Sequence, residues 1–172
     1  MRVVIVGASG TIGKAVAKAL EGRHEIVRVA YAHGEYRVDI ASRDSIQKLY
    51  DAIGAFDAMV AAAGLAKFGP LETLTDADFQ LGLSNKLMGQ VNLVRLGIRR
   101  VRDGGSFTLT SGVLATEPSP GGAAISPVNA AVEAFARAAG LELPRGIRIN
   151  AVSPPWVSET LASMGRDPAG GL

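Results

Sequence analysis

The first residues with the types and spacing for chemistry are three glycines near the amino end of the chain. Gly7, Gly10 and Gly13 are spaced glycine-x-x-glycine-x-x-glycine, between the β-branched run Arg2–Val6 and a helical pattern that begins at Thr11. In such a turn the first glycine allows a tight bend and the second lets backbone amides approach a phosphate. The third lets the helix pack on the strand. The turn therefore predicts a site for the diphosphate of a dinucleotide, although turn glycines also serve packing alone.

The elements that must hold this turn can be predicted because strand and helix signals alternate along the whole chain. Strands are expected over residues 2–6, 25–30, 58–62, 106–110 and 148–152, with a short one that ends near Asp39. Helices are expected over residues 11–20, after a cap at Ser42, over 76–102 and over 127–143. Strands separated by helices of this length run parallel, with right-handed crossovers. The predicted fold is therefore α/β, a Rossmann-type doubly wound parallel sheet in three α/β/α layers, with a single domain over residues 1–172.

Composition excludes several classes of protein. Hydrophobic residues make up 48% of the chain and the net charge is +2, which excludes a disordered chain. No apolar run approaches the roughly 20 residues of a membrane span, so we expect no membrane insertion and a cytoplasmic protein. Cysteine is absent, so disulfides and cysteine metal sites are excluded, and no metal site is expected.

A basic cluster near residue 100 raises the question of nucleic-acid binding. Arg95, Arg99, Arg100 and Arg102 form the only dense group of cations in the sequence. They fall at the expected end of a helix, where cations complement the helix dipole, and no aromatic residues interleave with them. Nucleic acid is therefore not an expected partner.

Further blocks extend the glycine turn into a pattern that resembles one family. Residues 7–13, 39–40, 60–64, 110–111 and 147–156 resemble the motifs of the short-chain dehydrogenase/reductase family, in the family's order and spacing. The resemblance implies an NAD(P)-dependent oxidoreductase that transfers hydride between the nicotinamide and a small carbonyl or alcohol substrate. It also implies a homo-oligomer paired through the helices expected over 76–102 and 127–143.

The resemblance also implies which residues bind the nucleotide. Asp39 and Ile40 would flank the adenine, and the stretch ending at Gly64 has alanines in place of the family's asparagines, so only its backbone role carries over. Pro155 replaces a glycine that is usual beside the nicotinamide. The complete set of expected cofactor-binding residues is Gly7, Ser9, Gly10, Thr11, Ile12, Gly13, Tyr31, His33, Asp39, Ile40, Ala62, Ala63, Gly64 and Pro154.

The residues after the second expected strand bear on the choice between NADP and NAD. A carboxylate there would bind the ribose hydroxyls and repel a 2′-phosphate. The chain has Tyr31 and His33 at this point and no carboxylate before Glu35, which favours NADP over NAD. His33 either contacts the 2′-phosphate or is simply solvated.

The resemblance fails at the family's acid–base centre, a serine followed by Tyr-x-x-x-Lys with an asparagine on the preceding helix. Ile125 and Asn129 stand at the tyrosine and lysine positions, and no tyrosine follows Tyr50 in the chain. Two candidate catalytic residues remain. Ser111 can hold a substrate oxygen or bond its own backbone, and Lys86, at the asparagine position, can donate a proton or bind an acidic substrate if burial lowers its pKa. The alternative for Lys86 is a solvated lysine or a subunit contact.

Two functions of different classes are consistent with these residues. The first is a reductase or dehydrogenase that works without the usual tyrosine. The second is a nucleotide-binding protein without turnover, either a sensor or an assembly partner, which explains the missing tyrosine and lysine more economically. An isomerase or lyase has no feature of its own. The short stretch after residue 152 leads us to expect that the family's further helix and seventh strand are missing.

Overall fold

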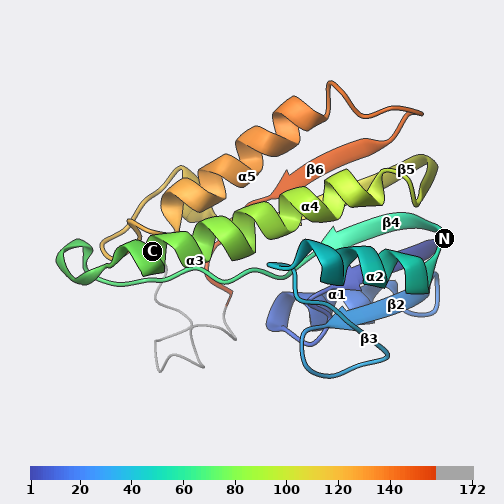
Figure 1. Cartoon of the computed structure of the whole chain (residues 1–172), viewed down its shortest axis with the longest axis horizontal. Coiled ribbons are helices and arrows are strands. Elements are labelled where there is room, and N and C mark those ends of the chain that lie inside the picture. Colours follow the sequence, from blue (N-terminus) through green and yellow to red (C-terminus); the bar gives the residue numbers. More distant parts are fainter. Residues whose placement is uncertain (158–172) are drawn as a thin grey trace.

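The computed structural model describes residues 1–157, which form one six-stranded sheet in the order β3-β2-β1-β4-β5-β6 (Figure 1). Each strand runs parallel to its neighbours. This arrangement confirms the predicted Rossmann-type sheet. The strands are β1 (Arg2–Val6), β2 (Glu25–Ala30), β3 (Tyr36–Arg37), β4 (Phe56–Ala61), β5 (Val101–Thr110) and β6 (Arg148–Val152).

Helices cover both faces of the sheet. On one face α1 packs its Ala17 against Val3 and Ile5 of β1. On the other face α2, α4 and α5 cover the larger core, and Figure 1 shows these three helices in front of the sheet. Among the described residues, none of these helices has both the length and the apolar character needed to span a membrane. The helices are α1 (Thr11–Leu20), α2 (Arg43–Ile53), α3 (Asp76–Leu81), a π-helix (Gly82–Leu87), α4 (Met88–Gly97) and α5 (Ser126–Ala139).

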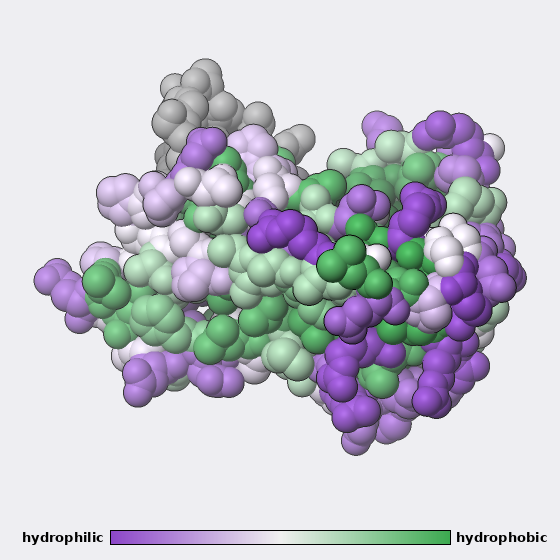
Figure 2. Space-filling view, turned by 90° about the horizontal axis from the view of Figure 1, so that it is seen from above, coloured by the Kyte–Doolittle hydropathy of each residue, from purple (hydrophilic) through white to green (hydrophobic). Residues whose placement is uncertain are grey.

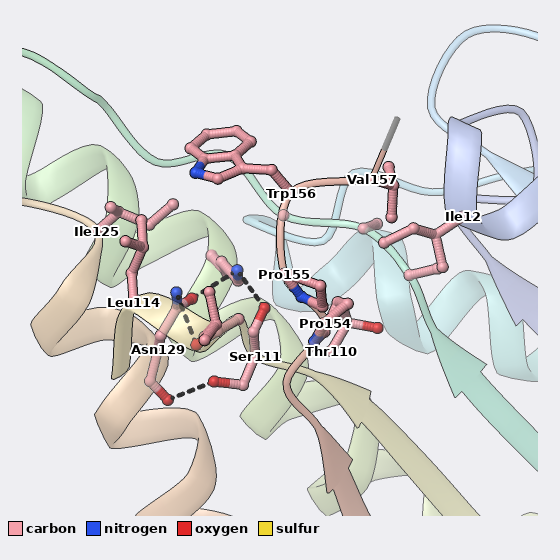
Figure 3. Close-up of a pocket in the computed structure, with 16 residues that line it drawn as sticks. Ile12, Thr110, Ser111, Leu114, Ile125, Asn129, Pro154, Pro155, Trp156 and Val157 are labelled. Atoms are coloured by element: carbon pink, nitrogen blue, oxygen red, sulfur yellow. Dashed lines mark hydrogen bonds between the residues drawn. The ribbon is translucent and has the colours of Figure 1, made fainter. Parts of the chain in front are cut away.

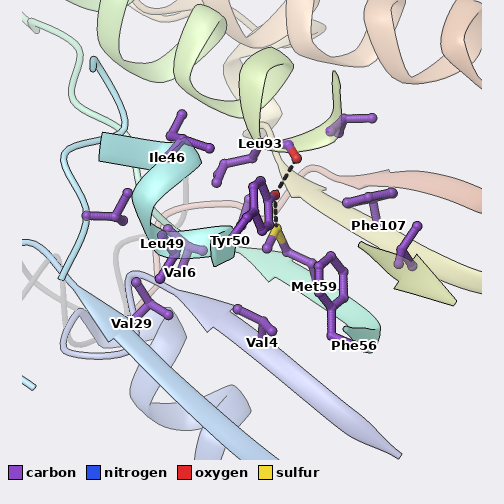
Figure 4. Packing of buried hydrophobic residues seen from close by; sticks show 14 of the residues in the cluster. Val4, Val6, Val29, Ile46, Leu49, Tyr50, Phe56, Met59, Leu93 and Phe107 are labelled. Carbon is purple, nitrogen blue, oxygen red and sulfur yellow. Dashed lines mark hydrogen bonds between the residues drawn. The ribbon is translucent and has the colours of Figure 1, made fainter. Parts of the chain in front are cut away.

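The larger core forms between α2, α4 and the strands at the centre of the sheet (Figure 4). Tyr50, Phe56 and Phe107 are fully buried, with Phe56 and Phe107 packed edge to face at a centroid distance of 6.0 Å. The hydroxyl of Tyr50 donates to the backbone oxygen of Leu93, and burial raises the pKa of Tyr50 well above its ordinary value. Tyr50 therefore serves the core and has no route to a ligand.

Strand order reverses between β1 and β4, since β2 and β3 lie on one side of β1 and β5 and β6 lie on the other. The carboxyl ends of all six strands meet at one edge of the sheet, because the strands are parallel. Ligands of doubly wound sheets bind at this edge, beside the reversal. The fold therefore directs attention to the segments that leave β1, β4, β5 and β6.

Charged side chains gather at the opposite edge, where the strands begin. Figure 2, which looks along the sheet from above, shows hydrophilic residues concentrated at its right-hand end, and Figure 1 places the amino ends of the strands there. Arg100 pairs with Asp51 at 2.5 Å, and Arg102 pairs with Asp57 at 2.9 Å. Two of the four clustered arginines thus have acidic partners and lie far from the ligand-binding edge.

The long helix expected over 76–102 is wrong in two respects. The structure divides it into α3, the π-helix and α4, and α4 ends at Gly97, where a side chain would meet Phe107 within 3 Å. β5 then begins at Val101, earlier than expected, because Val101 pairs with Phe56 before an irregularity near Gly104. The end of a helix among the clustered arginines is nevertheless confirmed, since Arg95 lies in the last turn of α4 and Arg99 and Arg100 lie in the turn that follows it.

Smaller differences concern the ends of three other elements. α5 stops at Ala139, before the expected end at residue 143, because Gly140 follows and successive turns replace the helix. β3 ends at Arg37, two residues before Asp39. β4 runs from Phe56 to Ala61, so it begins earlier than expected. The expected absence of a further helix and a seventh strand falls on residues 158–172, outside the described residues.

Candidate active site

The glycine turn has the geometry that close approach of a phosphate requires. Gly7 has a φ of +89°, and a Cβ added there would lie 2.6 Å from the backbone oxygen of Ala62. A Cβ at Gly13 would lie 2.1 Å from the backbone oxygen of Gly7, so helix α1 can pack this closely only with glycine. Both positions thus need glycine, because a side chain at either one would overlap neighbouring backbone atoms.

The amino terminus of α1 is open beyond this turn. Its N-cap residue, Gly10, supplies no side-chain hydrogen bond, and Ser9, Gly10 and Thr11 are exposed. Ile12 follows and lines the neighbouring cavity. The first amides of a helix have no partner within the helix and carry a partial positive charge, so they suit a diphosphate. These residues fit the expected dinucleotide.

The segment after β2 lies where the adenosine end of a dinucleotide would bind. Tyr31 and His33 are both exposed there, so both side chains are accessible to a ligand. Arg37 is an addition that the sequence did not suggest: it ends β3, opposite Ala30 of β2, and its side chain is exposed. The guanidinium of Arg37 thus adds a positive charge at the end of β3, next to the end of β2.

Asp39 and Ile40 occupy different environments from each other. Ile40 is only 5% exposed and packs in the core against Gly89, so its side chain cannot contact adenine. Asp39 is half-buried and its Oδ1 accepts from the backbone N–H of Ala41 at 2.9 Å. The side chain of Ile40 is therefore committed to the core, so only its backbone is left for the adenine, and the flanking of the adenine by Asp39 and Ile40 stays a prediction.

A cavity of about 220 Å³ continues from the glycine turn along the carboxyl ends of β4, β5 and β6 (Figure 3). It brings together residues that the sequence predicted for the cofactor and for catalysis. Most of its remaining walls are apolar, and Figure 3 shows Ile125 and Leu114 on one side with Ile12 on the other. The predicted residues that line it are Ile12, Ala62, Ala63, Gly64, Lys86, Ser111 and Pro154.

Lys86 is the charged residue of this cavity among the described residues. It is half-buried on the π-helix, and its stem crosses Gly64, where a Cβ would lie 2.6 Å from Cγ of Lys86. Its Nζ donates to Oδ1 of Asn129 at 2.7 Å and to the backbone oxygen of Ser111 at 3.0 Å. Burial lowers the pKa of Lys86 to about 8, so the ammonium form still predominates at pH 7.

The side chain of Ser111 points away from this cavity (Figure 3). Its Oγ lies 3.0 Å from the backbone oxygen of Asn129 and 3.0 Å from Oε1 of Glu133, both on α5. The same Oε1 accepts from Ser153 at 2.5 Å. Because the single hydroxyl hydrogen faces two acceptors of α5, this geometry differs from the expectation that the hydroxyl holds a substrate oxygen. Ser111 instead fastens the end of β5 to α5.

Gln90, on α4, is a site residue that sequence reasoning missed. It is fully buried, and its Nε2 donates to the backbone oxygen of Thr110 at 3.0 Å while its Oε1 accepts from the Thr110 N–H at 2.9 Å. β4 ends at Ala61, which pairs with Leu109, so Thr110 has no partner residue on β4. The side-chain amide of Gln90 supplies the hydrogen bonds that a neighbouring strand would otherwise make to Thr110. Gln90 thereby fixes the end of β5, where Thr110 and Ser111 line the cavity.

The positions of the family's tyrosine and lysine are now visible in space. Ile125 precedes α5 and lines the cavity, and Asn129 lies one turn later, in contact with Lys86. At the positions that the sequence comparison assigned to the family's lysine and asparagine the chain has Asn129 and Lys86, and the contact between these two side chains brings both to one cavity. No hydroxyl replaces the tyrosine at Ile125.

The chain matches, over residues 2–169, a family model described as enoyl-(acyl carrier protein) reductase. Among solved structures, protein lin1944 of Listeria innocua is 44% identical and superposes with a TM-score of 0.95, covering 100% of this chain and 86% of that chain. A small-chain dehydrogenase in complex with NADPH is 30% identical, with a TM-score of 0.80, and the match covers 90% of this chain and 69% of that one.

Among curated relatives, a versicolorin reductase of Emericella nidulans is 27% identical over 176 residues, 88% of this chain and 67% of its own length. The family model spans nearly the whole chain, and the strand order and glycine turn agree with it. The chain therefore belongs to the short-chain dehydrogenase/reductase family and is by class an NAD(P)-dependent oxidoreductase.

Proposed function

We propose that this protein is an NADP(H)-dependent reductase of small carbonyl compounds in which Lys86 donates the proton. The position of Lys86 carries the proposal, because its ammonium lies in the cavity where the family's tyrosine is missing. The bound nucleotide supplies the hydride. The residues of the chain must hold the nucleotide, orient the carbonyl and provide one proton.

The choice of NADP(H) rests on charge at the adenosine end. No carboxylate stands between β2 and Glu35, and Arg37 adds a positive charge at the end of β3, opposite Ala30 at the end of β2. A 2′-phosphate is attracted by such groups, whereas NAD binding usually relies on an acidic residue there. The similar dehydrogenase that was solved with NADPH supports the same choice.

The proton transfer follows from the state of Lys86. With a pKa near 8 its ammonium is a far stronger acid than an alcohol, so proton transfer to a newly formed alkoxide is downhill. Asn129 and the backbone oxygen of Ser111 hold two of its three protons, which leaves one for a ligand. Water can restore the proton afterwards.

The second candidate is a protein that binds the nucleotide without turnover. Ile125 favours this candidate, because an isoleucine at the position of the family's tyrosine has no hydroxyl that could donate a proton. The two candidates share the nucleotide site and differ only in whether Lys86 transfers a proton.

One experiment separates them. NADPH and NADH are titrated by their fluorescence, and a panel of carbonyl compounds is then screened for NADPH oxidation with the wild type, Lys86→Met and Lys67→Met. We expect NADPH to bind more tightly than NADH and turnover to depend on Lys86 but not on Lys67, an exposed lysine of the neighbouring loop. Tight NADPH binding with no oxidation by any carbonyl would favour the sensor.

Quaternary state and location remain predictions. A homo-oligomer through α4 and α5 is expected, and light scattering that finds only monomer at micromolar concentration would contradict it. Cytoplasmic location is likewise expected from the sequence, and fractionation of expressing cells tests it.

A further inference from the structure

The ammonium of Lys86 has no counter-charge among the described residues. Its two acceptors, the side-chain amide of Asn129 and the backbone of Ser111, are neutral. None of the ion pairs in the described part of the chain includes Lys86. A half-buried charge held only by neutral groups is stabilised further when an anion binds beside it.

The charged groups on the elements packed around the π-helix are occupied elsewhere. On α3, Asp78 accepts from the Thr75 cap, and Asp76 is exposed. On α4, Arg95 contacts Asn92. On α5, the carboxylate of Glu133 accepts from the hydroxyls of Ser111 and Ser153. The guanidinium of Arg137 lies 3.9 Å from the same carboxylate. None of these groups supplies the missing negative charge.

The walls of the cavity restrict the rest of the ligand. Leu114, Ile125 and Pro155 present apolar surface (Figure 3). The ring of Trp156 packs edge to face against Phe68 at a centroid distance of 5.8 Å. Two hydroxyls are near. Ser111 is directed to α5, whereas the Oγ1 of Thr110 is buried without a hydrogen-bond partner in the described part of the chain. A sugar or other polyol would leave most of its hydroxyls without partners here, which is costly.

We infer that Lys86 is the anchor for a carboxylate of the substrate, and that the substrate is an apolar 2-oxo acid. This inference rests on the proposed function for its redox step. A carboxylate and its neighbouring keto oxygen can both face one ammonium, so the group that fixes the acid is also beside the oxygen that needs a proton. In the reduction, C2 gains a hydride from the reduced nicotinamide nucleotide, which is oxidised. The keto oxygen takes a proton from Lys86, water reprotonates the amine, and the product is a 2-hydroxy acid.

The inference carries a pH dependence with a defined sign. The carboxylate is ionised throughout the neutral range, so binding depends on the ammonium of Lys86, whose pKa is about 8. Binding should be constant below that value. Above it the dissociation constant should rise about tenfold per pH unit, because the ligand then competes with loss of the proton.

The test uses the one tryptophan of the sequence, Trp156, which lines the cavity and reports its occupancy by fluorescence. Cyclohexanecarboxylate and cyclohexanecarboxamide have the same apolar ring and differ in charge. Without nucleotide, we expect the acid to bind at least about tenfold more tightly than the amide, as charge-assisted hydrogen bonds allow. Lys86→Met should abolish the difference, and Lys67→Met should preserve it.

Two further measurements keep the result decisive. Lys86→Arg retains the positive charge and should retain the preference for the acid over the amide. This variant therefore separates loss of charge from damage to the cavity. Circular dichroism checks that each variant is folded. Equal binding of acid and amide by the wild type, or no binding of either, overturns the inference. Failure of the proposed function has a different signature, because it appears as absent NADPH binding or absent carbonyl reduction, whichever ligand Trp156 detects.

Discussion

The glycine turn and the Lys86 cavity lie at the same edge of the sheet, yet they are built from different parts of the chain. The turn consists of backbone, and at Gly13 even one added carbon would lie 2.1 Å from the Gly7 oxygen. The cavity is lined mainly by side chains from the π-helix, α5 and the segments after β5 and β6, and it meets the turn at Ile12 and at the segment after β4. A site built of closely packed backbone leaves no room for other residue types at Gly7 and Gly13, whereas a site built of side chains can keep its place while its side chains change.

The strongest test of this contrast is Gly13→Ala. The new methyl group must displace the backbone of Gly7, so we expect either loss of the folded state or an increase of at least about 100-fold in the NADPH dissociation constant. Thermal unfolding and NADPH titration measure the two outcomes. Gly69→Ala is the matched control, because its Cβ would lie 3.8 Å from Leu74, an ordinary contact. Unchanged NADPH affinity in folded Gly13→Ala would show that the turn does not bind the diphosphate.

On the side-chain half of the comparison, Lys86→Met should reduce kcat for carbonyl reduction by roughly 10²–10⁴-fold, the usual contribution of a positioned acid. The NADPH dissociation constant should change little, because Lys86 lies on a different element from the turn. Steady-state kinetics and fluorescence titration give the two numbers. Equal losses in kcat and in NADPH affinity would mean that the glycine turn and the Lys86 cavity do not act independently.

A third experiment follows the charge of Lys86 through stability. The pKa is about 8 in the folded protein and near 10.5 in the unfolded chain, so the unfolded state holds more protons between these values. Stability of the wild type should therefore rise from pH 8 to pH 10.5, by at most about 3 kcal/mol. Lys86→Met should lack this rise and Lys67→Met should keep it, as measured by urea unfolding across the range. Parallel curves for wild type and Lys86→Met would place Lys86 in water.

The smallest effect is expected for Ser111→Ala. Loss of one hydroxyl that bonds α5 should lower the free energy of unfolding by about 1 kcal/mol and change kcat less than about tenfold. Denaturant unfolding and the same kinetic assay are sufficient. A loss of 100-fold or more in kcat with stability intact would return Ser111 to the role that the sequence suggested, that of holding the substrate oxygen.

The strands and the helix around the glycine turn could be predicted well from the sequence. β1, α1, β2 and β6 have the predicted bounds, since β-branched runs and helical spacing of apolar residues dictate them locally. The glycine turn was equally readable, because only glycine tolerates the close contacts found there. These features depend on neighbours along the chain.

The side-chain half was less readable because its contacts join distant segments. The direction of Ser111 follows the strand alternation of Phe107 and Leu109, which both face the α4 and α5 side, and that signal was available in the sequence. By contrast, nothing in the sequence marks Gln90 as the partner of Thr110, 20 residues away. The contact of Lys86 with Asn129 spans 43 residues and needed the fold to be seen.

The π-helix between α3 and α4 has a consequence for how this chain could diverge. Such a wide turn holds one residue more than an α-helical turn would. Deleting one residue within Gly82–Leu87 would restore regular α-helical winding and leave α3 and α4 nearly in phase, because the wide turn already absorbs the extra residue. Which side chain of this turn reaches the cavity thus depends on one extra residue, and a single-codon deletion could withdraw Lys86 from the cavity while α3 and α4 keep their places.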